Sequence, residues 1–441
     1  MNVNEQRRRL VGAMGLLGLS GCAAVPTSAV PTSSVPTSAG STSAGPTLAP
    51  WQPGQLDIHH LAIGRGSATL VILPDGTSLL IDAGASANAT DVSVATRPGP
   101  QRRAGEWIAR YAQRHLAPTG ARGLDYLLVS HLHPDHLGDV APGLPQSRHG
   151  NYRLTGVMDV AERLDIGTLV DRGFPDYRYP GAGIERAPFA ANYRAYVTAR
   201  QAGGGAVQRF EAGTDRQFLP RGHRPVDERF GRFAVRNIAV NGEVWTGRGD
   251  ERRATFPDPA TLADRDRPSE NMCCAAVRIE SGPFRYFTGA DLTSDTFNGD
   301  LPWRDILGAA ARAAGPVDVA TADHHGLYDG VSADVARTLR PSAWVIPTWH
   351  ISHPSLQQLE HMFNERLYAG PREVFATEVM HENALMHRRL MQKLRSTRGH
   401  VIVRVEAGGE RFRMLVTDNA DEADRVIYES APIRSGAIKP A

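Results

Sequence analysis

The sequence predicts an α/β fold, built from short apolar strands that alternate with helices. Apolar runs such as Leu124–Val129 have strand character and end directly in histidine or aspartate. Segments with helical spacing of their apolar residues, such as Ala104–Leu116, lie between these runs. The chain has 441 residues and a formal net charge of +2, which fits one large domain with insertions or two to three smaller domains. This near-neutral charge neither favours nor excludes nucleic acid as a partner.

Residues 1–22 have the order of a lipoprotein signal peptide. Arg7–Arg9 form a basic region, Leu10–Leu19 form an apolar run too short for a permanent membrane span, and Leu19–Cys22 resembles a bacterial lipobox. We expect export and lipid attachment at Cys22, on the periplasmic side of the envelope. Ala23 is typical of outer-membrane lipoproteins, and the arginines fit either Sec or twin-arginine export. The alternative is a disordered tail with a chance cysteine.

Residues 23–50 repeat Pro-Thr-Ser units, which bury no core and stay extended. We expect a linker here and a folded domain over 51–441. That domain should open with three strands, in which His59 and His60 are structural. Near its end the third strand carries Asp82, which supports a site or simply caps a turn. The three expected strands are Leu56–Leu61, Thr69–Leu73 and Ser78–Gly84.

The chain is organised around His131-Leu132-His133-Pro134-Asp135-His136, which follows the strand Leu124–Val129. His131 and His133 are two residues apart, so in an extended segment they project to one side and can share an ion. Asp135 and His136 can serve a second ion beside the first. Imidazole and carboxylate are standard zinc donors. The alternative is a histidine-rich surface loop.

A further strand, Ile166–Asp171, ends in an acid after the expected helix Val157–Leu164. Asp171 is our candidate for the third ligand of the first ion, and His149 competes with it. The following residues, 173–269, are rich in arginine, glycine and proline. We expect an insertion that sets specificity or is merely solvated, with a helix at Ala191–Arg200 and a strand at Phe233–Val240.

The second half of the chain carries more strand-end candidates. Cys273 and Cys274 are adjacent, so a bridge between them would be strained, and we interpret both as small apolar core residues. His353 precedes the expected helix Leu356–Phe363. The other expected strands are Glu270–Ile279, Phe284–Asp291, Val317–Gly326 and Ala343–Pro347, and the candidate metal ligands at their ends are Asp291, His324 and His325.

The His-x-His-x-Asp-His motif resembles that of the metallo-β-lactamase superfamily. The order of the later motifs is similar to the metallo-β-lactamase-like C-terminal domain of bacterial competence DNA-uptake channel proteins, over about Leu56–Val405 and interrupted by the 173–269 insertion. The resemblance implies an αββα four-layer sandwich with the site where the two sheets meet. It also implies that Asp82 supports the metal loop, that Asp291 bridges two ions, and that His324 or His325 completes the set. The motifs are Ser78–Gly84, His131–His136, Thr288–Asp291, Asp318–Gly326 and Ser352–Ser355.

The implied activity is a dinuclear metal-dependent hydrolase that uses a metal-bridging hydroxide, with Zn²⁺ the expected metal. Asp135 and His353 are the candidate catalytic residues, with His353 donating to an oxyanion or leaving group or only neighbouring a helix start. The expected substrate is a phosphodiester, in a small molecule or in nucleic acid. The alternatives are a β-lactam, lactone or thioester hydrolase, and a non-catalytic envelope-binding lipoprotein.

Overall fold

A computed structural model describes residues 45–87, 91–181, 183–228 and 232–436. The expected signal peptide, Cys22 and most of the linker lie outside these residues. The end of the expected linker is attached to the folded part, since Leu48 is buried against Ile402 and Leu415, and its amide donates to the Asp424 carbonyl at 2.9 Å. Within the described residues, no helix combines the length and apolarity that a bilayer crossing needs.

Two mixed sheets form the centre of the domain. In the first, β3 to β6 run parallel and the remaining pairs are antiparallel. Its strands, in spatial order, are β17 (Val426–Glu429), β16 (Arg411–Thr417), β15 (His400–Val405), β1 (Leu56–His60), β2 (Thr69–Ile72), β3 (Ser78–Ile81), β4 (Leu124–Val129), β5 (Ile166–Asp171) and β6 (Ala206–Arg209), with β18 (Ile433–Arg434) paired to β16.

The second sheet has its parallel strands at the other end of the order, from β11 to β14. Its strands, in spatial order, are β14 (Glu373–Ala376), β13 (Ala343–Ile346), β12 (Val319–Thr321), β11 (Phe284–Thr288), β10 (Ala276–Ser281), β7 (Phe233–Val240), β8 (Glu243–Trp245) and β9 (Arg252–Ala254).

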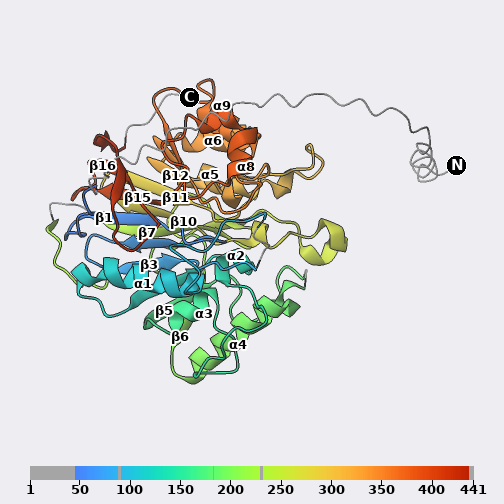
Figure 1. The fold of residues 1–441 in the computed structure, drawn as a ribbon. Helices are drawn as coiled ribbons and strands as arrows, with labels where there is room; N and C mark the ends of the chain where they lie inside the picture. The colour runs from blue at the N-terminus through green and yellow to red at the C-terminus, as the bar shows by residue number, and fades with distance from the viewer. Residues whose placement is uncertain (1–44, 88–90, 182, 229–231, 437–441) are drawn as a thin grey trace, which may run out of the picture. The chain divides into compact units, whose positions relative to one another are not determined.

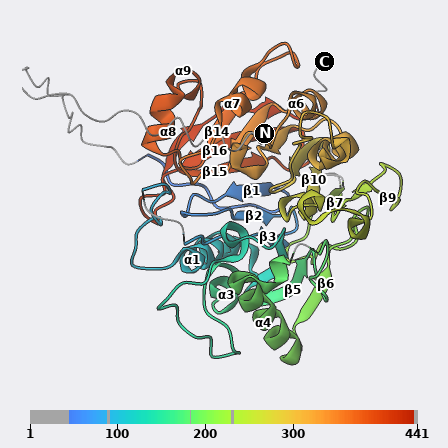
Figure 2. The same ribbon diagram turned by 90° about the vertical axis from the view of Figure 1, so that its right-hand side faces the viewer.

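Helices cover the outer face of each sheet, as Figures 1 and 2 show. The first group of helices packs on the first sheet through one apolar cluster, and the second group packs on the second sheet through another. The helices are α1 (Ala104–Leu116), α2 (Pro134–Leu137), α3 (Gly156–Ala161) and α4 (Pro188–Ala202) on one side, and α5 (Ile306–Ala314), α6 (Ala333–Leu339), α7 (Leu356–Phe363), α8 (His381–Met386) and α9 (Arg388–Met391) on the other.

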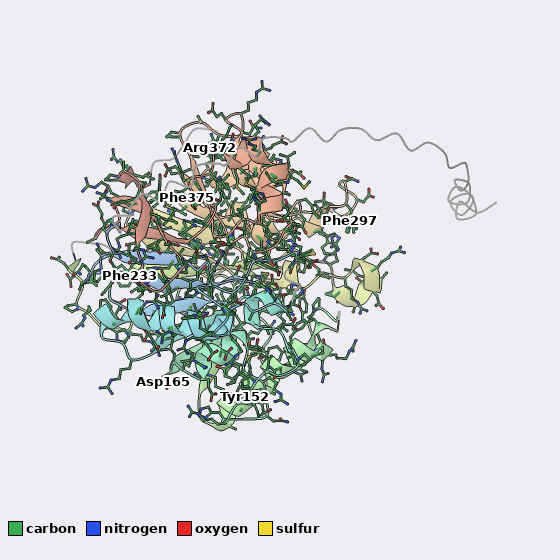
Figure 3. All side chains as sticks on the ribbon, viewed as in Figure 1. Tyr152, Asp165, Phe233, Phe297, Arg372 and Phe375 are labelled. Atoms are coloured by element: carbon green, nitrogen blue, oxygen red, sulfur yellow. The ribbon has the colours of Figure 1, made fainter. Side chains whose placement is uncertain are left out.

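A third apolar cluster fills the space between the sheets, and buried side chains alternate with outer-face ones along strands of both. Phe375 of β14 belongs to this cluster and Phe233 of β7 packs against it (Figure 3). The order helix, sheet, sheet, helix is the αββα sandwich that the sequence predicted, and it is consistent with the metallo-β-lactamase fold.

The strongest sequence patterns give the helix and strand bounds as expected, including α1, β5, β7 and α7. The 173–269 segment is more than an insertion. Its strand β7 pairs with β10 inside the second sheet, and β6 extends the first sheet beside β5. The arginine-rich composition concealed this, because only short parts of the segment are apolar.

Parallel strands bring their carboxyl ends to one edge of a sheet. Strands β3, β4 and β5 deliver the residues after Ile81, Val129 and Asp171 to one edge of the first sheet. Strands β11, β12 and β13 do the same for the second sheet. The expected ligands therefore converge from both sheets.

Candidate metal centre

The motif loop is held by backbone contacts with the loops that flank β2 and β3. The Ser67 amide donates to the Asp135 carbonyl at 2.8 Å, and the Ala83 amide donates to the His136 carbonyl at 2.9 Å. Gly84 lies so close that a Cβ there would be 1.8 Å from the Asp135 carbonyl oxygen. The Asp-Ala-Gly end of β3 therefore needs glycine for this contact.

Two groups of side chains in the described residues have the spacing of a metal site, and they share one carboxylate. The first group is His131, His133 and Asp291. The second is Asp135, His136, Asp291 and His325. The ligand atoms within each group lie within 4.8 Å of one another. His131 and His133 of the motif thus belong to one group and Asp135 and His136 to the other, so two ions would be held on either side of the shared Asp291.

Asp82 orients residues from both halves of the motif through hydrogen bonds to His136 and Ser130. His136 Nδ1 donates to Asp82 Oδ2 at 2.7 Å, which directs Nε2 into the centre. The Ser130 hydroxyl donates to the same carboxylate at 2.7 Å, and His131 Nδ1 lies 3.1 Å from that hydroxyl. Because the hydroxyl proton is used on Asp82, His131 Nδ1 is the donor to Ser130, and its Nε2 lies 3.0 Å from His133 Nδ1 inside the centre.

His325 is oriented in the same way by the second sheet. Its Nδ1 lies 2.9 Å from the Pro347 carbonyl oxygen, which only accepts, so this nitrogen carries the proton. Its Nε2 donates to Asp135 Oδ2 at 2.9 Å and lies 3.5 Å from Asp291 Oδ2, so a bound ion would replace the proton on this nitrogen. Three of the four histidines in the two groups thus have Nδ1 held by another group, which directs Nε2 into the centre.

The electrostatics of the centre follow from burial and from the convergence of opposite charges. Burial lowers the pKa of His136, but the carboxylates of Asp291, Asp82 and Asp135 outweigh it and raise that pKa well above its usual value. Burial also opposes charging of His325, yet Asp291 and Asp135 raise its pKa to about 10. Burial raises the pKa of Asp291, while His136 and His325 pull it well below its usual range. The Asp291 carboxylate is therefore anionic.

Several backbone positions at the centre are strained. Asp82, Ala290, His324 and His325 have φ of 61°, 54°, 52° and 54°, in the left-handed region that non-glycine residues rarely adopt. Such positions persist only where the surroundings fix them, and they cluster at functional sites. Here they turn the chain sharply after β3, β11 and β12.

The residues present fit a pair of divalent ions. His136 Nε2 is buried and has no hydrogen-bond partner in the described part of the chain. It lies 3.2 Å from Asp291 Oδ1 and 3.7 Å from Asp135 Oδ2, so two carboxylates converge on it. Two carboxylates that converge on a buried imidazole nitrogen favour a cation at that point, either a proton on the ring or a divalent ion that replaces it. Imidazole and carboxylate donors suit zinc among the common metals.

His353 lies beside this centre. Its ring stacks on that of His325 at 4.8 Å between centroids and 9° between planes, and Trp349 contacts both rings edge-on. Burial, followed by the nearby His325, lowers the pKa of His353 well below its usual value, so the ring is neutral. Its Nδ1 is buried and makes no hydrogen bond to any described residue.

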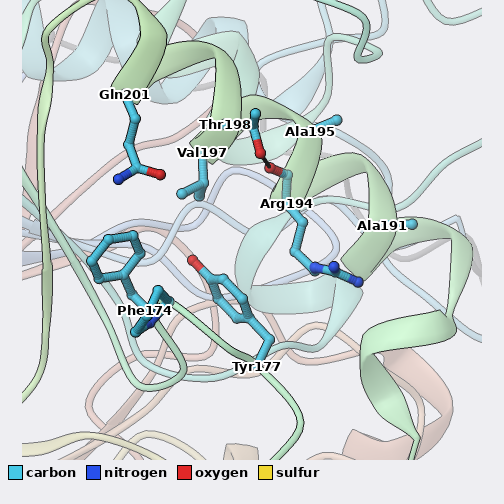
Figure 4. Close-up of a pocket in the computed structure, with 9 residues that line it drawn as sticks. Phe174, Tyr177, Ala191, Arg194, Ala195, Val197, Thr198 and Gln201 are labelled. Carbon is cyan, nitrogen blue, oxygen red and sulfur yellow. Dashed lines mark hydrogen bonds between the residues drawn. The ribbon is translucent and has the colours of Figure 1, made fainter.

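Asp171 does not join the centre. Its carboxylate accepts hydrogen bonds from the amides of Gly173 and Phe174 at 2.8 and 2.7 Å, and from the hydroxyls of Tyr177 and Tyr193 at 2.7 and 2.8 Å. It thus organises the loop after β5. Tyr177 also lines a pocket against α4, which Figure 4 shows, away from the motif residues. The expected third ligand of the first ion is therefore not Asp171.

The other candidates have separate roles. His324 Nδ1 donates to Asp329 at 2.6 Å, and its Nε2 accepts from the Asn271 amide at 2.9 Å, so His325 alone of this pair joins the metal-ligand groups. His149 has a side chain that is 60% exposed. His59 and His60 are buried within β1, and Cys273 and Cys274 are buried free thiols.

Two supporting groups were not singled out from the sequence. Ser130, the last residue before the motif, links His131 to Asp82. The Pro347 carbonyl fixes the tautomer of His325. A hydroxyl directly before a histidine motif is a usable signal, whereas a carbonyl on another strand has no signal in the sequence.

Comparisons with known proteins agree with this centre. Residues 62–156 match the family model described as the metallo-beta-lactamase superfamily, and this stretch includes Asp82 and the whole His131–His136 motif. That part of the chain therefore carries a metallo-β-lactamase superfamily signature, and the two-sheet architecture is consistent with the fold of that superfamily. A search of the curated proteins finds no match.

Solved structures with similar folds include CmlA, a diiron β-hydroxylase from Streptomyces venezuelae, at 13% identity and a TM-score of 0.37. That alignment covers 79% of this chain and 54% of CmlA, so the chain spans about half of CmlA. Another is the metallo-beta-lactamase fold protein YhfI from Bacillus subtilis, at 13% identity and a TM-score of 0.33, with 79% of this chain and 99% of YhfI covered.

Proposed function

We propose that this protein is a dinuclear metal-dependent hydrolase, and that it acts as a phosphodiesterase. The observation that carries the proposal is the pair of ligand groups that share Asp291. Two neighbouring divalent ions would activate a water as nucleophile and stabilise the charge that develops on the attacked group. The histidine and carboxylate donors favour Zn²⁺.

Side chains around the ligands orient them and provide a proton donor. Asp82 and Ser130 hold His131 and His136 in the tautomers that ligation requires. The neutral His353, stacked on His325, has a ring nitrogen free to donate to an oxyanion or a leaving oxygen. We therefore give His353 a catalytic role beyond the ligands.

Two arguments favour a phosphodiester as substrate. A pair of ions suits in-line displacement at phosphorus, because one can face the attacking oxygen and the other the leaving oxygen. The order of motifs resembles a domain of DNA-uptake proteins, whose substrate class is nucleic acid. The net charge of +2 lacks the broad basic surface that long polyanions favour. A short or small-molecule phosphodiester therefore fits better than long duplex DNA.

The test is the activity of the purified protein on phosphodiester, lactone and β-lactam substrates, with and without a chelator. Phosphodiester turnover should disappear with the chelator and return with Zn²⁺. Asp135→Ala should abolish turnover while the circular-dichroism spectrum stays that of the parent, and His149→Ala, which changes a surface histidine, should keep full activity. Retained phosphodiesterase activity in metal-stripped Asp135→Ala protein would contradict the mechanism. Turnover of a lactone or β-lactam alone would contradict the phosphodiester as substrate but not the proposed metal centre.

The role of His353 has a separate test. His353→Phe keeps the ring stacked on His325 but removes both nitrogens. We expect kcat to fall roughly 100-fold, within the range for a lost proton donor, with zinc content unchanged. Loss of zinc from this variant would instead make His353 a support for His325.

We also propose that the protein is anchored by lipid at Cys22, on the periplasmic side of the envelope. The lipobox-like Leu19–Cys22 and the Pro-Thr-Ser repeats after it support this. Cys22→Ala should move the protein from the membrane fraction to the soluble fraction. Unchanged fractionation would contradict the proposal.

A further inference from the structure

The first ligand group, His131, His133 and the shared Asp291, lacks the further ligand of its own that the sequence assigned to Asp171. We propose that Asn271 supplies it through its side-chain oxygen, Oδ1. The inference rests on the two-ion centre proposed above and completes its first half.

Asn271 belongs to a short segment that lies against the motif. Its neighbour Glu270 accepts a hydrogen bond from the Leu132 amide at 2.6 Å, between the two histidines of the first group. The Ala275 amide donates to the Ser130 carbonyl at 3.0 Å on the other side. Asn271 therefore lies, in the 3-10 turn Asn271–Cys273, between two residues that are bonded to Leu132 and to Ser130.

The orientation of the Asn271 amide is fixed by His324. Asn271 Nδ2 lies 2.9 Å from His324 Nε2, and His324 Nδ1 donates to Asp329 at 2.6 Å. The NH₂ group of an amide only donates, so His324 Nε2 accepts this hydrogen bond. His324 is held in turn by its amide, which donates to the Ala290 carbonyl at 2.9 Å, next to Asp291.

This arrangement leaves Asn271 Oδ1 pointing away from His324 with no donor. The atom is buried, and none of the described residues gives it a hydrogen bond. A buried carbonyl oxygen without a donor costs roughly 1–3 kcal/mol, so its retention needs an explanation. An ion held by His131, His133 and Asp291 would supply the missing partner, since amide oxygens are accepted ligands of divalent ions.

The same arrangement explains the second histidine of the His324-His325 pair. His325 binds in the second group, and His324 acts as a positioning residue that aims Asn271 at the first ion. The two histidines are adjacent after one strand, yet His325 would bind one ion directly and His324 would act on the other ion through Asn271.

The experiment is a zinc-binding measurement on the full chain with three variants. Asn271→Leu keeps the size of the side chain and removes the oxygen, Asn271→Asp keeps an oxygen donor, and His324→Ala removes the group that aims it. Asn237→Leu is the matched control, because Asn237 on β7 is also buried with an unpartnered Oδ1 and a bonded Nδ2. Zinc stoichiometry and affinity are read by chelator competition, and Co²⁺ absorption reports the ligand field directly.

We expect the parent to bind two ions. Asn271→Leu should keep the ion of the second group and bind the other at least tenfold more weakly, and His324→Ala should weaken it roughly 10–100-fold. Asn271→Asp should keep two ions, because an oxygen donor remains at position 271. Asn237→Leu should also keep two ions, because Asn237 lies outside the ligand groups. Parent-like binding by Asn271→Leu with two ions in the parent overturns this inference alone. Fewer than two ions in the parent overturns the proposed function as well.

Discussion

Among the described residues of the domain, two sets of histidines lie close together, and one of them, the metal centre, has the ligand spacing of a metal site. The second set, here called the α1 cluster, comprises His59, His115, His400 and Tyr111 between α1 and the first sheet. Ring centroids of His59 and His115 are 4.8 Å apart, and those of Tyr111 and His400 are 4.6 Å apart.

The difference lies in the carboxylates. In the α1 cluster, Asp57 is neutralised by Arg404, whose guanidinium donates to both of its oxygens at 2.9 and 2.6 Å. Burial then dominates and lowers the pKa of His59 to about 4 and that of His400 to about 3. In the metal centre, Asp135 and Asp291 face histidines instead. Buried imidazoles become a candidate cation site only where anionic oxygens converge on them without a guanidinium.

The largest expected effect comes from removing the shared carboxylate. Asp291→Asn should reduce bound zinc from two ions to fewer than one and lower turnover at least 10³-fold, since both ligand groups lose a member. His400→Asn, a change in the α1 cluster, should keep both ions. Metal analysis after gel filtration measures this. Two tightly bound ions in Asp291→Asn would contradict the claim that converging carboxylates separate the metal centre from the α1 cluster.

A smaller effect is expected from the carboxylate behind the ligands. Asp82→Asn should weaken zinc binding roughly 10–100-fold, because His136 and Ser130 lose the acceptor that sets their orientation. Asp75 is the matched control. It is a buried acid at the other end of β3 that accepts from the Thr77 hydroxyl at 2.8 Å. If Asp75→Asn weakens zinc as much as Asp82→Asn, the effect is one of stability and not of orientation.

The α1 cluster should instead reveal itself through the pH dependence of stability. The pKa of His400 falls from 6.5 to about 3 on folding, chiefly through burial, so below pH 6.5 the unfolded chain binds a proton that the folded chain does not. Stability is therefore lost as pH falls. Urea unfolding of metal-free protein at pH 7 and pH 5 should show a drop about 1–2 kcal/mol smaller in His400→Asn than in the parent. Equal drops in the free energy of unfolding for the variant and the parent would show that the pH dependence comes from groups other than His400.

Much of this architecture was visible in the sequence, because the informative signals are local. Apolar runs that end in acid or histidine gave β3, β4, β5 and β11 and located the edge where the ligands meet. Alternation in His131–His133 predicted the division of the motif between the two ligand groups. The ambiguity between His324 and His325 could not be resolved this way. It depends on Asp329 and Pro347, which select opposite roles for the two rings through contacts made only after folding.

Asp171 shows the limit of such local signals most clearly. It follows an apolar strand just as the aspartates that face the metal centre do, so the sequence pattern alone cannot separate it from them. What separates Asp171 is a pair of hydroxyls, from Tyr177 on the following loop and Tyr193 on α4. The segment that contains them is the one whose composition indicated a solvated insertion. The contribution of β7 to the second sheet was missed for the same reason.

The smallest effect on zinc should come from Asp171 itself. In Asp171→Asn, the retained oxygen can still accept from the Gly173 and Phe174 amides, and the tyrosine hydroxyls can rotate to accept from the new NH₂ group. We expect a loss of about 1 kcal/mol in the free energy of unfolding and no change in zinc stoichiometry or affinity. Urea unfolding and chelator competition on the same sample measure both. Loss of one ion from Asp171→Asn, with Asn271→Leu unaffected, would return Asp171 to the ligand set and remove Asn271 from it.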